Sequence, residues 1–174
     1  IIIPRATYAP WKKDKSFKEI YKKIKKNTLT DVLRLYYIYE ICKKLRFLKA
    51  DAIEIGAWRG GVSFLISSIF TDSKIYISDT FEGVVKTSNI DSKYINGMHS
   101  DSSISQVQNL FSKYKISNFK ILKGVFPEQT SKLIQKKKFK FAHIDTDTYK
   151  STKDSFEFIW PLVIKNGCVI IDDY

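Results

Sequence analysis

The chain has 174 residues and a mass of 20.2 kDa, which suits one domain with a buried core. Hydrophobic residues make up 44% and aromatic residues 14% of the chain, which excludes global disorder. No apolar run approaches the roughly 18 residues that a membrane-spanning helix needs. The chain has 30 Lys and Arg against 18 Asp and Glu, and the net charge of +12 by itself favours an anionic partner, nucleic acid or lipid.

The chain begins IIIPRATYAPW, without an initiator Met, and this segment is too short and too aromatic for a signal peptide. We therefore expect this start to be the edge of a fragment or of a processed chain. The two cysteines, Cys42 and Cys168, lie far apart in different expected elements and form no CxxC motif. They favour a reducing compartment, and we expect a cytoplasmic protein.

The positive charge is concentrated in residues 1–50, which carry a net charge of +10, whereas residues 51–174 carry +2. Apolar residues recur at helical spacing among these lysines and predict a short amphipathic helix within residues 12–26. The lysines of this segment are Lys12, Lys13, Lys15, Lys18, Lys22, Lys23, Lys25 and Lys26. A solvated helix face explains them best, and binding of an acidic surface is the alternative.

Helical and strand patterns alternate along the rest of the chain. A second helix is expected over residues 32–48, with Asp31 or a preceding Thr as its N-cap. Strands are expected at 52–55, 74–78, 119–122, 139–144 and 168–171. The helices expected between them lie at 62–70, 105–114, 128–137 and 151–159. Residues 83–104 are polar and weakly patterned, and predict a long loop.

This alternation predicts an α/β fold with a doubly wound, mostly parallel sheet that helices cover on both faces. We divide the chain into a basic N-terminal helical region, residues 1–48, and a core, residues 49–174. Ligands of such folds bind outside the carboxyl ends of the strands, at the point where the strand order reverses. Each expected strand ends in Gly or Asp, which are ordinary turn residues one by one. Because all five ends carry them, we expect a site at this edge.

Two of these ends indicate a cofactor that contains a nucleoside. Gly56, Gly60 and Gly61 follow the first strand, where glycine lets the backbone turn close to a ligand. The pattern is not GxGxxG and lacks a P-loop Lys, so a phosphate cradle is poorly supported, and a simple turn is the alternative. Asp79 ends the next strand, 25 residues after Glu54. A carboxylate there can accept both ribose hydroxyls, or it can cap a turn.

Three carboxylates are expected to converge at two neighbouring strand ends: Asp145, Asp172 and Asp173. They repel one another unless a cation compensates, and no Lys or Arg adjoins the last pair in the sequence. Oxygen ligands of this kind suit Mg²⁺, and the alternative is that one or two of them cap helices or face solvent. His143 lies in an apolar strand and is better explained as a core residue. With two His and isolated cysteines, zinc is disfavoured.

Five segments, in order, resemble the macrocin-type sugar O-methyltransferases: EIGAWRGG, SDTFEG, GVFPEQT, HIDTDTYKST and IDDY. The resemblance covers about residues 50–174, and the last two segments are its specific part. This family consists of class I, S-adenosylmethionine-dependent enzymes that methylate sugar hydroxyls in macrolide and aminocoumarin biosynthesis. The resemblance therefore implies a Rossmann-like fold, S-adenosylmethionine as cofactor and a divalent metal, usually Mg²⁺.

The resemblance also assigns roles to individual residues. The implied cofactor site consists of Glu54, Gly56, Trp58, Gly60, Gly61, Ser63, Asp79, Gly124, Phe126 and Asp145. Asp79 would bind the ribose hydroxyls, and residues 124–126 would lie near the adenine or the ribose. Asp145, Asp172 and Asp173 match the metal ligands. Asp147 matches the position proposed as general base in at least part of the family.

The chain departs from the family pattern in three places. It stops at Tyr174, directly after the last metal motif, whereas family members continue, so we expect the sequence to be incomplete. The loop at 83–104 carries no clear family signature, which leaves the acceptor open. The Lys-rich N-terminal region has no counterpart in the resemblance.

We expect an O-methyltransferase that acts on a hydroxyl of a sugar or glycosylated small molecule. A catechol-like phenol acceptor, which also suits Mg²⁺ and a vicinal diol, is one alternative. A non-enzymatic basic module that binds nucleic acid or an anionic surface is another, although the charge split disfavours nucleic acid as partner. A homo-oligomer stays open.

Overall fold

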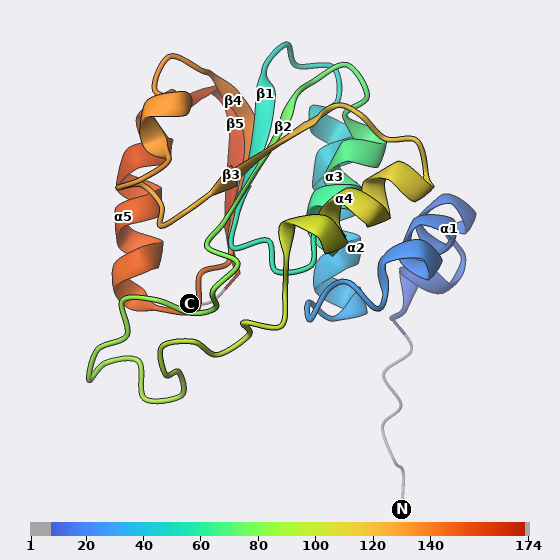
Figure 1. The fold of residues 1–174 in the computed structure, drawn as a ribbon. Coiled ribbons are helices and arrows are strands. Elements are labelled where there is room, and N and C mark those ends of the chain that lie inside the picture. Colours follow the sequence, from blue (N-terminus) through green and yellow to red (C-terminus); the bar gives the residue numbers. More distant parts are fainter. Residues whose placement is uncertain (1–7, 173–174) are drawn as a thin grey trace, which may run out of the picture.

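A computed structural model of the chain describes residues 8–172, and residues 1–7, 173 and 174 lie outside that range. Five parallel strands form one sheet in the order β3-β2-β1-β4-β5 (Figure 1). The strands are β1 (Asp51–Ile55), β2 (Ile75–Asp79), β3 (Phe119–Lys123), β4 (Phe139–Ile144) and β5 (Val163–Ile171). The predicted doubly wound parallel sheet is confirmed, and the strand order reverses between β1 and β4.

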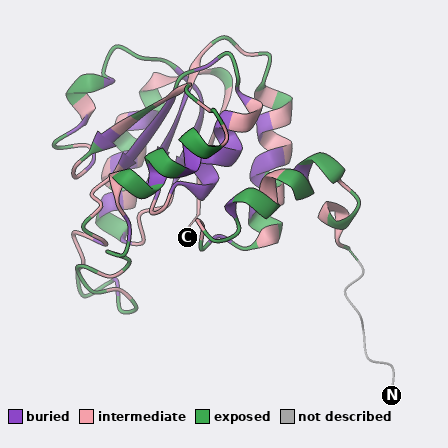
Figure 2. Ribbon diagram, turned by 45° about the vertical axis from the view of Figure 1, so that its right-hand side comes forward, coloured by how far each residue is buried: buried purple, intermediate pink, exposed green. Residues whose placement is uncertain are grey.

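Helices cover both faces of this sheet (Figure 1). The α-helices are α1 (Lys15–Ile24), α2 (Val32–Leu45), α3 (Gly61–Ile69), α4 (Ile104–Lys113) and α5 (Tyr149–Ile159). Short 3₁₀ turns occur at η1 (Pro10–Lys12), η2 (Ser131–Leu133) and η3 (Trp160–Leu162). The first four α-helices lie on one face and α5 lies on the other (Figure 1). The inner strands β1, β2 and β4 are buried, the edge strands β3 and β5 are only partly buried, and the outer helix surfaces are exposed (Figure 2).

The N-terminal helices share their core with the sheet. Phe17 and Ile24 of α1 are fully buried, in the same apolar cluster as Phe64 of α3. The Phe17 ring packs edge-on against Tyr36 of α2, with 5.1 Å between ring centroids. Every lysine from Lys12 to Lys26 is exposed, so the predicted amphipathic helix with a cationic outer face is confirmed.

The helix predicted at residues 128–137 is wrong. This connection between β3 and β4 holds a single 3₁₀ turn, Ser131–Leu133. Ile134 is fully buried, but Leu133 is 56% exposed and four lysines surround the pair, so the segment has no apolar stripe to bury. Most helical stability in a protein comes from burying such a stripe. As a result, α5 is the one α-helix that covers its face of the sheet in residues 8–172.

Two other expectations are settled by the backbone. The fifth strand begins at Val163, five residues earlier than predicted, because Val163 already pairs with Phe139 of β4. The register then shifts before Cys168 pairs with Phe141. Residues 80–103 contain only turns and bends, so the predicted long loop is confirmed.

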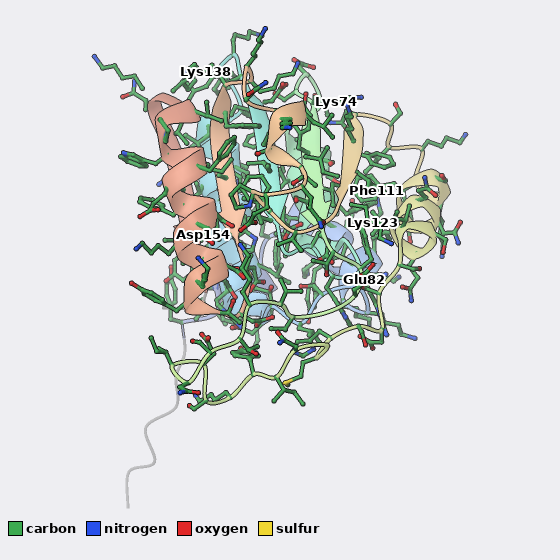
Figure 3. The ribbon with its side chains drawn as sticks, turned by 60° about the vertical axis from the view of Figure 1, so that its left-hand side comes forward. Lys74, Glu82, Phe111, Lys123, Lys138 and Asp154 are labelled. Atoms are coloured by element: carbon green, nitrogen blue, oxygen red, sulfur yellow. The ribbon has the colours of Figure 1, made fainter. Side chains whose placement is uncertain are left out.

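All five strands point the same way, so their carboxyl ends form one edge. Lys74 and Lys138, which precede β2 and β4, lie at the opposite edge from Glu82 and Asp154 (Figure 3). The long loop runs along the carboxyl edge, below the sheet in the view of Figure 1. The loop therefore covers a region that is formed by the carboxyl ends of the strands.

We expect Phe17→Ala to lower the free energy of unfolding by about 3–5 kcal/mol, because it removes a fully buried ring. Phe47→Ala is the matched control, since Phe47 is 73% exposed, and its cost should stay within about 0.5 kcal/mol. Urea denaturation of both variants measures the difference. A cost below about 1 kcal/mol for Phe17→Ala would mean that α1 does not stabilise the sheet.

Candidate functional site

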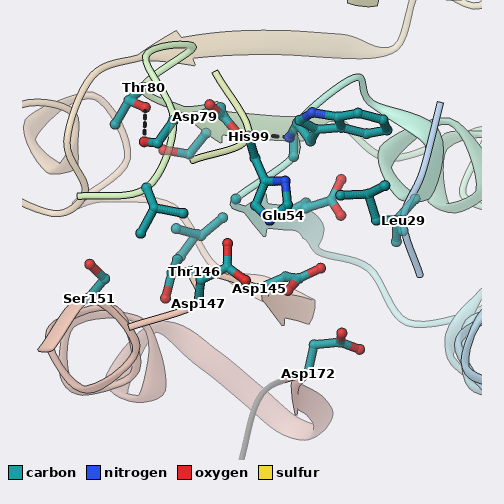
Figure 4. A pocket seen from close by; sticks show the side chains of 18 of the residues that line it. Leu29, Glu54, Asp79, Thr80, His99, Asp145, Thr146, Asp147, Ser151 and Asp172 are labelled. Atoms are coloured by element: carbon teal, nitrogen blue, oxygen red, sulfur yellow. Dashed lines mark hydrogen bonds between the residues drawn. The ribbon is translucent and has the colours of Figure 1, made fainter. Parts of the chain in front are cut away.

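A cavity of about 320 Å³ opens at the carboxyl edge of the sheet, around the point where the strand order reverses. Its lining comes from all five strand ends, the loop at 80–103, the segment before α2, and single residues of α2, α3 and α5. The lining residues are Thr28, Leu29, Thr30, Arg34, Glu54, Ile55, Gly56, Ala57, Trp58, Val62, Ser78, Asp79, Thr80, Gly83, Val84, Val85, Tyr94, His99, Gly124, Phe126, Asp145, Thr146, Asp147, Ser151 and Asp172. Asp145 and Asp147 lie between Asp79 on one side and Asp172 on the other (Figure 4).

The backbone of this edge is held by hydrogen bonds that continue the sheet by one residue past each strand. The N–H of Asp145 donates to the carbonyl of Ile55, and the N–H of Asp172 donates to that of Ile144, both at 2.9 Å. These bonds fix the two aspartates on adjacent strand ends. The convergence predicted for Asp145 and Asp172 is therefore present, while Asp173 lies outside the described residues.

Gly56 is the position where a side chain cannot fit. Its φ is +86°, and a Cβ would lie 1.7 Å from the carbonyl oxygen of Asp145. A larger residue would push β1 and β4 apart at the floor of the cavity. Gly56 thus lets the turn after β1 pass close beneath any ligand in the cavity.

Three residues of the glycine-rich segment that were predicted for the cofactor site lie outside the cavity lining. They are Gly60, Gly61 and Ser63. The N–H of Gly61 donates to the carbonyl of Asn27 at 2.9 Å, and a Cβ on Gly61 would lie 2.5 Å from that oxygen. Ser63 donates its hydroxyl proton to the Glu54 carboxylate. These residues shape the cavity by docking the N-terminal segment and by holding Glu54.

Asp79 ends β2 and faces the cavity. Its two oxygens accept hydrogen bonds from the backbone N–H groups of Phe81, at 2.6 Å, and Trp58, at 2.7 Å. Burial raises the pKa of the Asp79 carboxyl, and these N–H groups act in the opposite direction by favouring the ionised form. A carboxylate has about four acceptor positions, so each oxygen still has capacity for a further donor.

Trp58 connects the turn after β1 to the long loop. Its indole Nε1–H donates to Asp101 at 2.7 Å, and Arg59 pairs with the same carboxylate at 2.6 Å. Near the middle of the loop, Asp91 accepts from the backbone N–H of Tyr149 at 2.7 Å. The loop is therefore fixed to both sides of the cavity that it covers.

Asp147 projects into the cavity from a tight turn after β4 (Figure 4). The N–H of Thr148 donates to the carbonyl of Thr146 at 2.7 Å, and Asp147 between them has φ = +63°. This is the geometry of a γ-turn with positive φ, which is rare and strained for a residue other than glycine. Strained backbone of this kind concentrates at functional sites.

A row of ionisable side chains runs beneath the cavity across three neighbouring strands. Glu54 of β1 and His143 of β4 are paired in register, and Oε1 of Glu54 lies 3.1 Å from Nδ1 of His143. Nε2 of His143 lies 3.8 Å from Oδ1 of Asp172, which is an ion-pair distance, too long for a hydrogen bond. Oδ2 of Asp172 pairs with Nη1 of Arg34, from α2. Carboxylates and basic groups alternate along this row of side chains.

His143 is fully buried, as expected for a core residue. Burial alone lowers the pKa of an imidazole, and the carboxylates of Asp172 and Glu54 outweigh it and raise the pKa of His143 to about 10. Its two carboxylate neighbours therefore favour the protonated imidazole at neutral pH.

The donor atoms around Asp145 fit a divalent cation in part. One atom each from His143, Asp145 and Asp172 lie within 4.8 Å of one another. Two of these three groups are carboxylates, the hard oxygen donors that Mg²⁺ prefers. Arg34, which is distant in the sequence, already pairs with one of them.

Comparison with known proteins agrees with these observations. Residues 28–174 match the macrocin O-methyltransferases (TylF). The chain belongs to this family. It is 28% identical over 139 residues to the 8-demethyl-8-(2,3-dimethoxy-alpha-L-rhamnosyl)-tetracenomycin-C 4'-O-methyltransferase of Streptomyces olivaceus. It is 27% identical over 138 residues to the demethyldecarbamoylnovobiocin O-methyltransferase of Streptomyces niveus. The aligned part is 71% of this chain and 52% of each relative, so the chain spans about half their length.

Solved structures show the same fold. The calicheamicin methyltransferase CalS11 superposes with a TM-score of 0.72 at 13% identity, over 98% of this chain and 80% of that one. A putative caffeoyl-CoA O-methyltransferase from Staphylococcus aureus gives 0.64 at 21% identity, over 92% and 68%. The sheet is thus the Rossmann-like sheet of class I methyltransferases, as the resemblance implied. None of the helices in residues 8–172 is long and apolar enough to cross a membrane.

The family match begins at residue 28, well before the resemblance at residues 50–174 that the motifs carry. The cavity lining begins at the same residue. Thr28, Leu29, Thr30 and Arg34 reach the cavity although the sequence offered no sign beyond the N-cap at Asp31, whose side chain accepts from two N–H groups of α2. His99, exposed and with φ = +60°, also lines the cavity and has no motif around it.

The pKa of His143 predicts how stability changes with pH. Because the folded-state pKa is about 10 and the ordinary pKa is about 6.5, the charged pair stabilises the fold fully below pH 6.5 and is lost as the pH rises through 10. The difference in free energy of unfolding between wild type and His143→Gln should therefore shrink between these values. Urea denaturation at a series of pH values measures it, and a difference that stays constant would contradict an imidazolium.

Proposed function

We propose that the protein is an S-adenosylmethionine-dependent O-methyltransferase that methylates a hydroxyl of a sugar or glycosylated small molecule. The observation that carries the proposal is the set of Gly56, Asp79, Asp145 and Asp147 around one cavity at the carboxyl edge of a class I methyltransferase sheet. Family membership supports it, since both curated relatives are O-methyltransferases and the name of one specifies a rhamnosyl compound.

The cofactor would lie across the turn after β1 and the end of β2. Gly56 allows the close approach, and Asp79 would accept the ribose hydroxyls on the acceptor positions that Phe81 and Trp58 leave. Gly124 and Phe126, at the end of β3, would border the adenine or ribose. When bound, S-adenosylmethionine supplies an electrophilic methyl group on a sulfonium.

Asp147 would be the general base. It would accept the proton of the acceptor hydroxyl, provided that this hydroxyl lies within about 3 Å of the carboxylate. The γ-turn holds its carboxylate at the cavity wall, so its position depends little on ligand. Loop residues and Leu29 would exclude water and hold the acceptor in line with the methyl group.

Asp145 and Asp172, together with Asp173, would hold Mg²⁺. A divalent cation, when bound, supplies charge that lowers the pKa of a nearby hydroxyl. The two unpaired cysteines, Cys42 and Cys168, support a reducing compartment, and we place the protein in the cytoplasm.

Two other functions remain as competitors. A catechol-like phenol could replace the sugar, because both offer a vicinal diol. A non-enzymatic basic module would use the exposed lysines of α1, which lie outside the cavity lining. Binding through them would weaken steeply with salt and would disappear when residues 1–26 are deleted.

Asp79 provides the test of the cofactor site. Asp79→Asn should weaken binding of S-adenosylhomocysteine by about 10- to 100-fold, since it loses charge-assisted hydrogen bonds to the ribose. Calorimetry with 2′-deoxy-S-adenosylhomocysteine makes the test specific to the ribose. Wild type should bind this analogue more weakly than S-adenosylhomocysteine, and Asp79→Asn should bind both equally. Glu82→Gln is the control, because Glu82 is a 72% exposed carboxylate on the same loop. Equal discrimination by wild type and Asp79→Asn would place the ribose elsewhere.

Asp147→Asn provides the test of the reaction. Transfer of labelled methyl groups should occur to glycosylated acceptors in preference to catechols, and Asp147→Asn should lower kcat by about 10²–10⁴-fold with unchanged S-adenosylhomocysteine binding. Glu157→Gln, an exposed carboxylate on α5, should retain full turnover. Full turnover by Asp147→Asn would reject Asp147 as base.

The same assay tests the metal and the non-enzymatic alternative. Transfer that is unchanged by a chelator and by Asp172→Ala would remove the metal from the proposal. Cofactor binding without transfer to any sugar or phenol, together with salt-sensitive binding of a polyanion, would favour the basic module.

A further inference from the structure

Arg34 reaches the cavity from outside the parallel sheet and its crossovers. It lies in the first turn of α2, and Nη1 of its guanidinium pairs with Oδ2 of Asp172, 138 residues away in the chain. Nε of the same guanidinium donates to Oδ2 of Asp31 at 2.7 Å. Oδ1 of Asp31 accepts from the N–H groups of Leu33 and Arg34, so the helix N-cap also orients the arginine. Two carboxylates thus hold the guanidinium at the strand ends.

Both oxygens of Asp172 face a nitrogen-bearing side chain of the protein itself. Oδ2 meets Arg34, and Oδ1 lies 3.8 Å from Nε2 of His143. The Asp172 side chain is only 6% exposed, so these groups interact where water screens them weakly. A divalent cation beside Asp145 and Asp172 would therefore meet the guanidinium at close range and would be repelled by it.

The two partners of Asp172, His143 and Arg34, differ in their freedom to move. His143 is fully buried between strands, whereas the Arg34 side chain is 45% exposed. Arg34 can turn from Asp172 toward solvent and keep its hydrogen bond to Asp31. Of the two, only the arginine can make room for a metal without disturbing the sheet.

We propose that Arg34 is a built-in counter-ion of the metal-facing carboxylate, which competes with a divalent cation for Asp172 and lowers the metal affinity of the site. The inference rests on the metal site of the proposed function. A helix that precedes the sheet in the sequence thus acts directly on the site. The guanidinium on α2 stabilises Asp172 when no metal is bound and moves away when a metal binds.

The test is a titration of the full chain with Mn²⁺, followed by electron paramagnetic resonance, without cofactor or acceptor. Arg34→Gln should bind Mn²⁺ at least about tenfold more tightly than wild type, because the competing charge is gone. Arg34→Lys should lie between them, since an ammonium cannot bridge Asp31 and Asp172 as the planar guanidinium does. Arg46→Gln is the matched control: it removes an exposed arginine at the C-terminal end of the same helix, outside the cavity lining, and should leave the affinity unchanged.

The double variant Arg34→Gln/Asp172→Asn identifies the ligand, because it should lose the gain in affinity. Affinity that is equal or lower in Arg34→Gln, or a gain as large in Arg46→Gln, overturns the inference. Absence of Mn²⁺ binding in both wild type and Arg34→Gln overturns it as well. Methyl transfer is scored separately, so a failed transfer assay with a shifted Mn²⁺ affinity rejects the proposed function and retains the role of Arg34. Thermal unfolding confirms that each variant is folded.

Discussion

The site depends on one constraint, which is that carboxylates buried at the ends of β1 and β5 need positive partners. Burial of an unpaired carboxylate costs several kcal/mol, so Glu54, 1% exposed, could not be tolerated alone. The parallel register places His143 beside it, and the same imidazolium faces Asp172. Arg34 completes the pairing from α2. Because three strands and a helix contribute to these contacts, the geometry of the cavity floor is coupled to the packing of the whole N-terminal half.

The glycine-rich turn shows the same coupling from the backbone. Gly56 is required by the carbonyl of Asp145, on the neighbouring strand, and Gly61 by the carbonyl of Asn27, in the segment before α2. One turn thus joins β1, β4 and the N-terminal helices within a few residues. This explains why residues 28–34 line the cavity, and why the family match starts at residue 28.

The sequence predicts the sheet and the edge where the cavity lies, because strands and their terminal Gly and Asp residues are local patterns. It does not predict the pairing of Arg34 with Asp172, since a contact across 138 residues leaves no periodicity or spacing to detect. Nor does the sequence predict that His143 lies between two carboxylates, because these carboxylates are on β1 and after β5. The false helix at 128–137 has the opposite cause, because its residues permit a helix locally but offer no apolar stripe to bury.

The distribution of charge decides what the cavity can accept. Its lining carries five carboxylates against one arginine, although the chain as a whole has a net charge of +12. The eight lysines within residues 12–26, which contribute a large part of this excess, are exposed and lie outside the lining. A polyanion would be repelled by such a cavity, whereas a sulfonium cofactor and a divalent cation both gain from it. Under the proposed function the two cations share one acidic cavity, and Arg34 keeps the acidic strand ends paired while the metal position is empty.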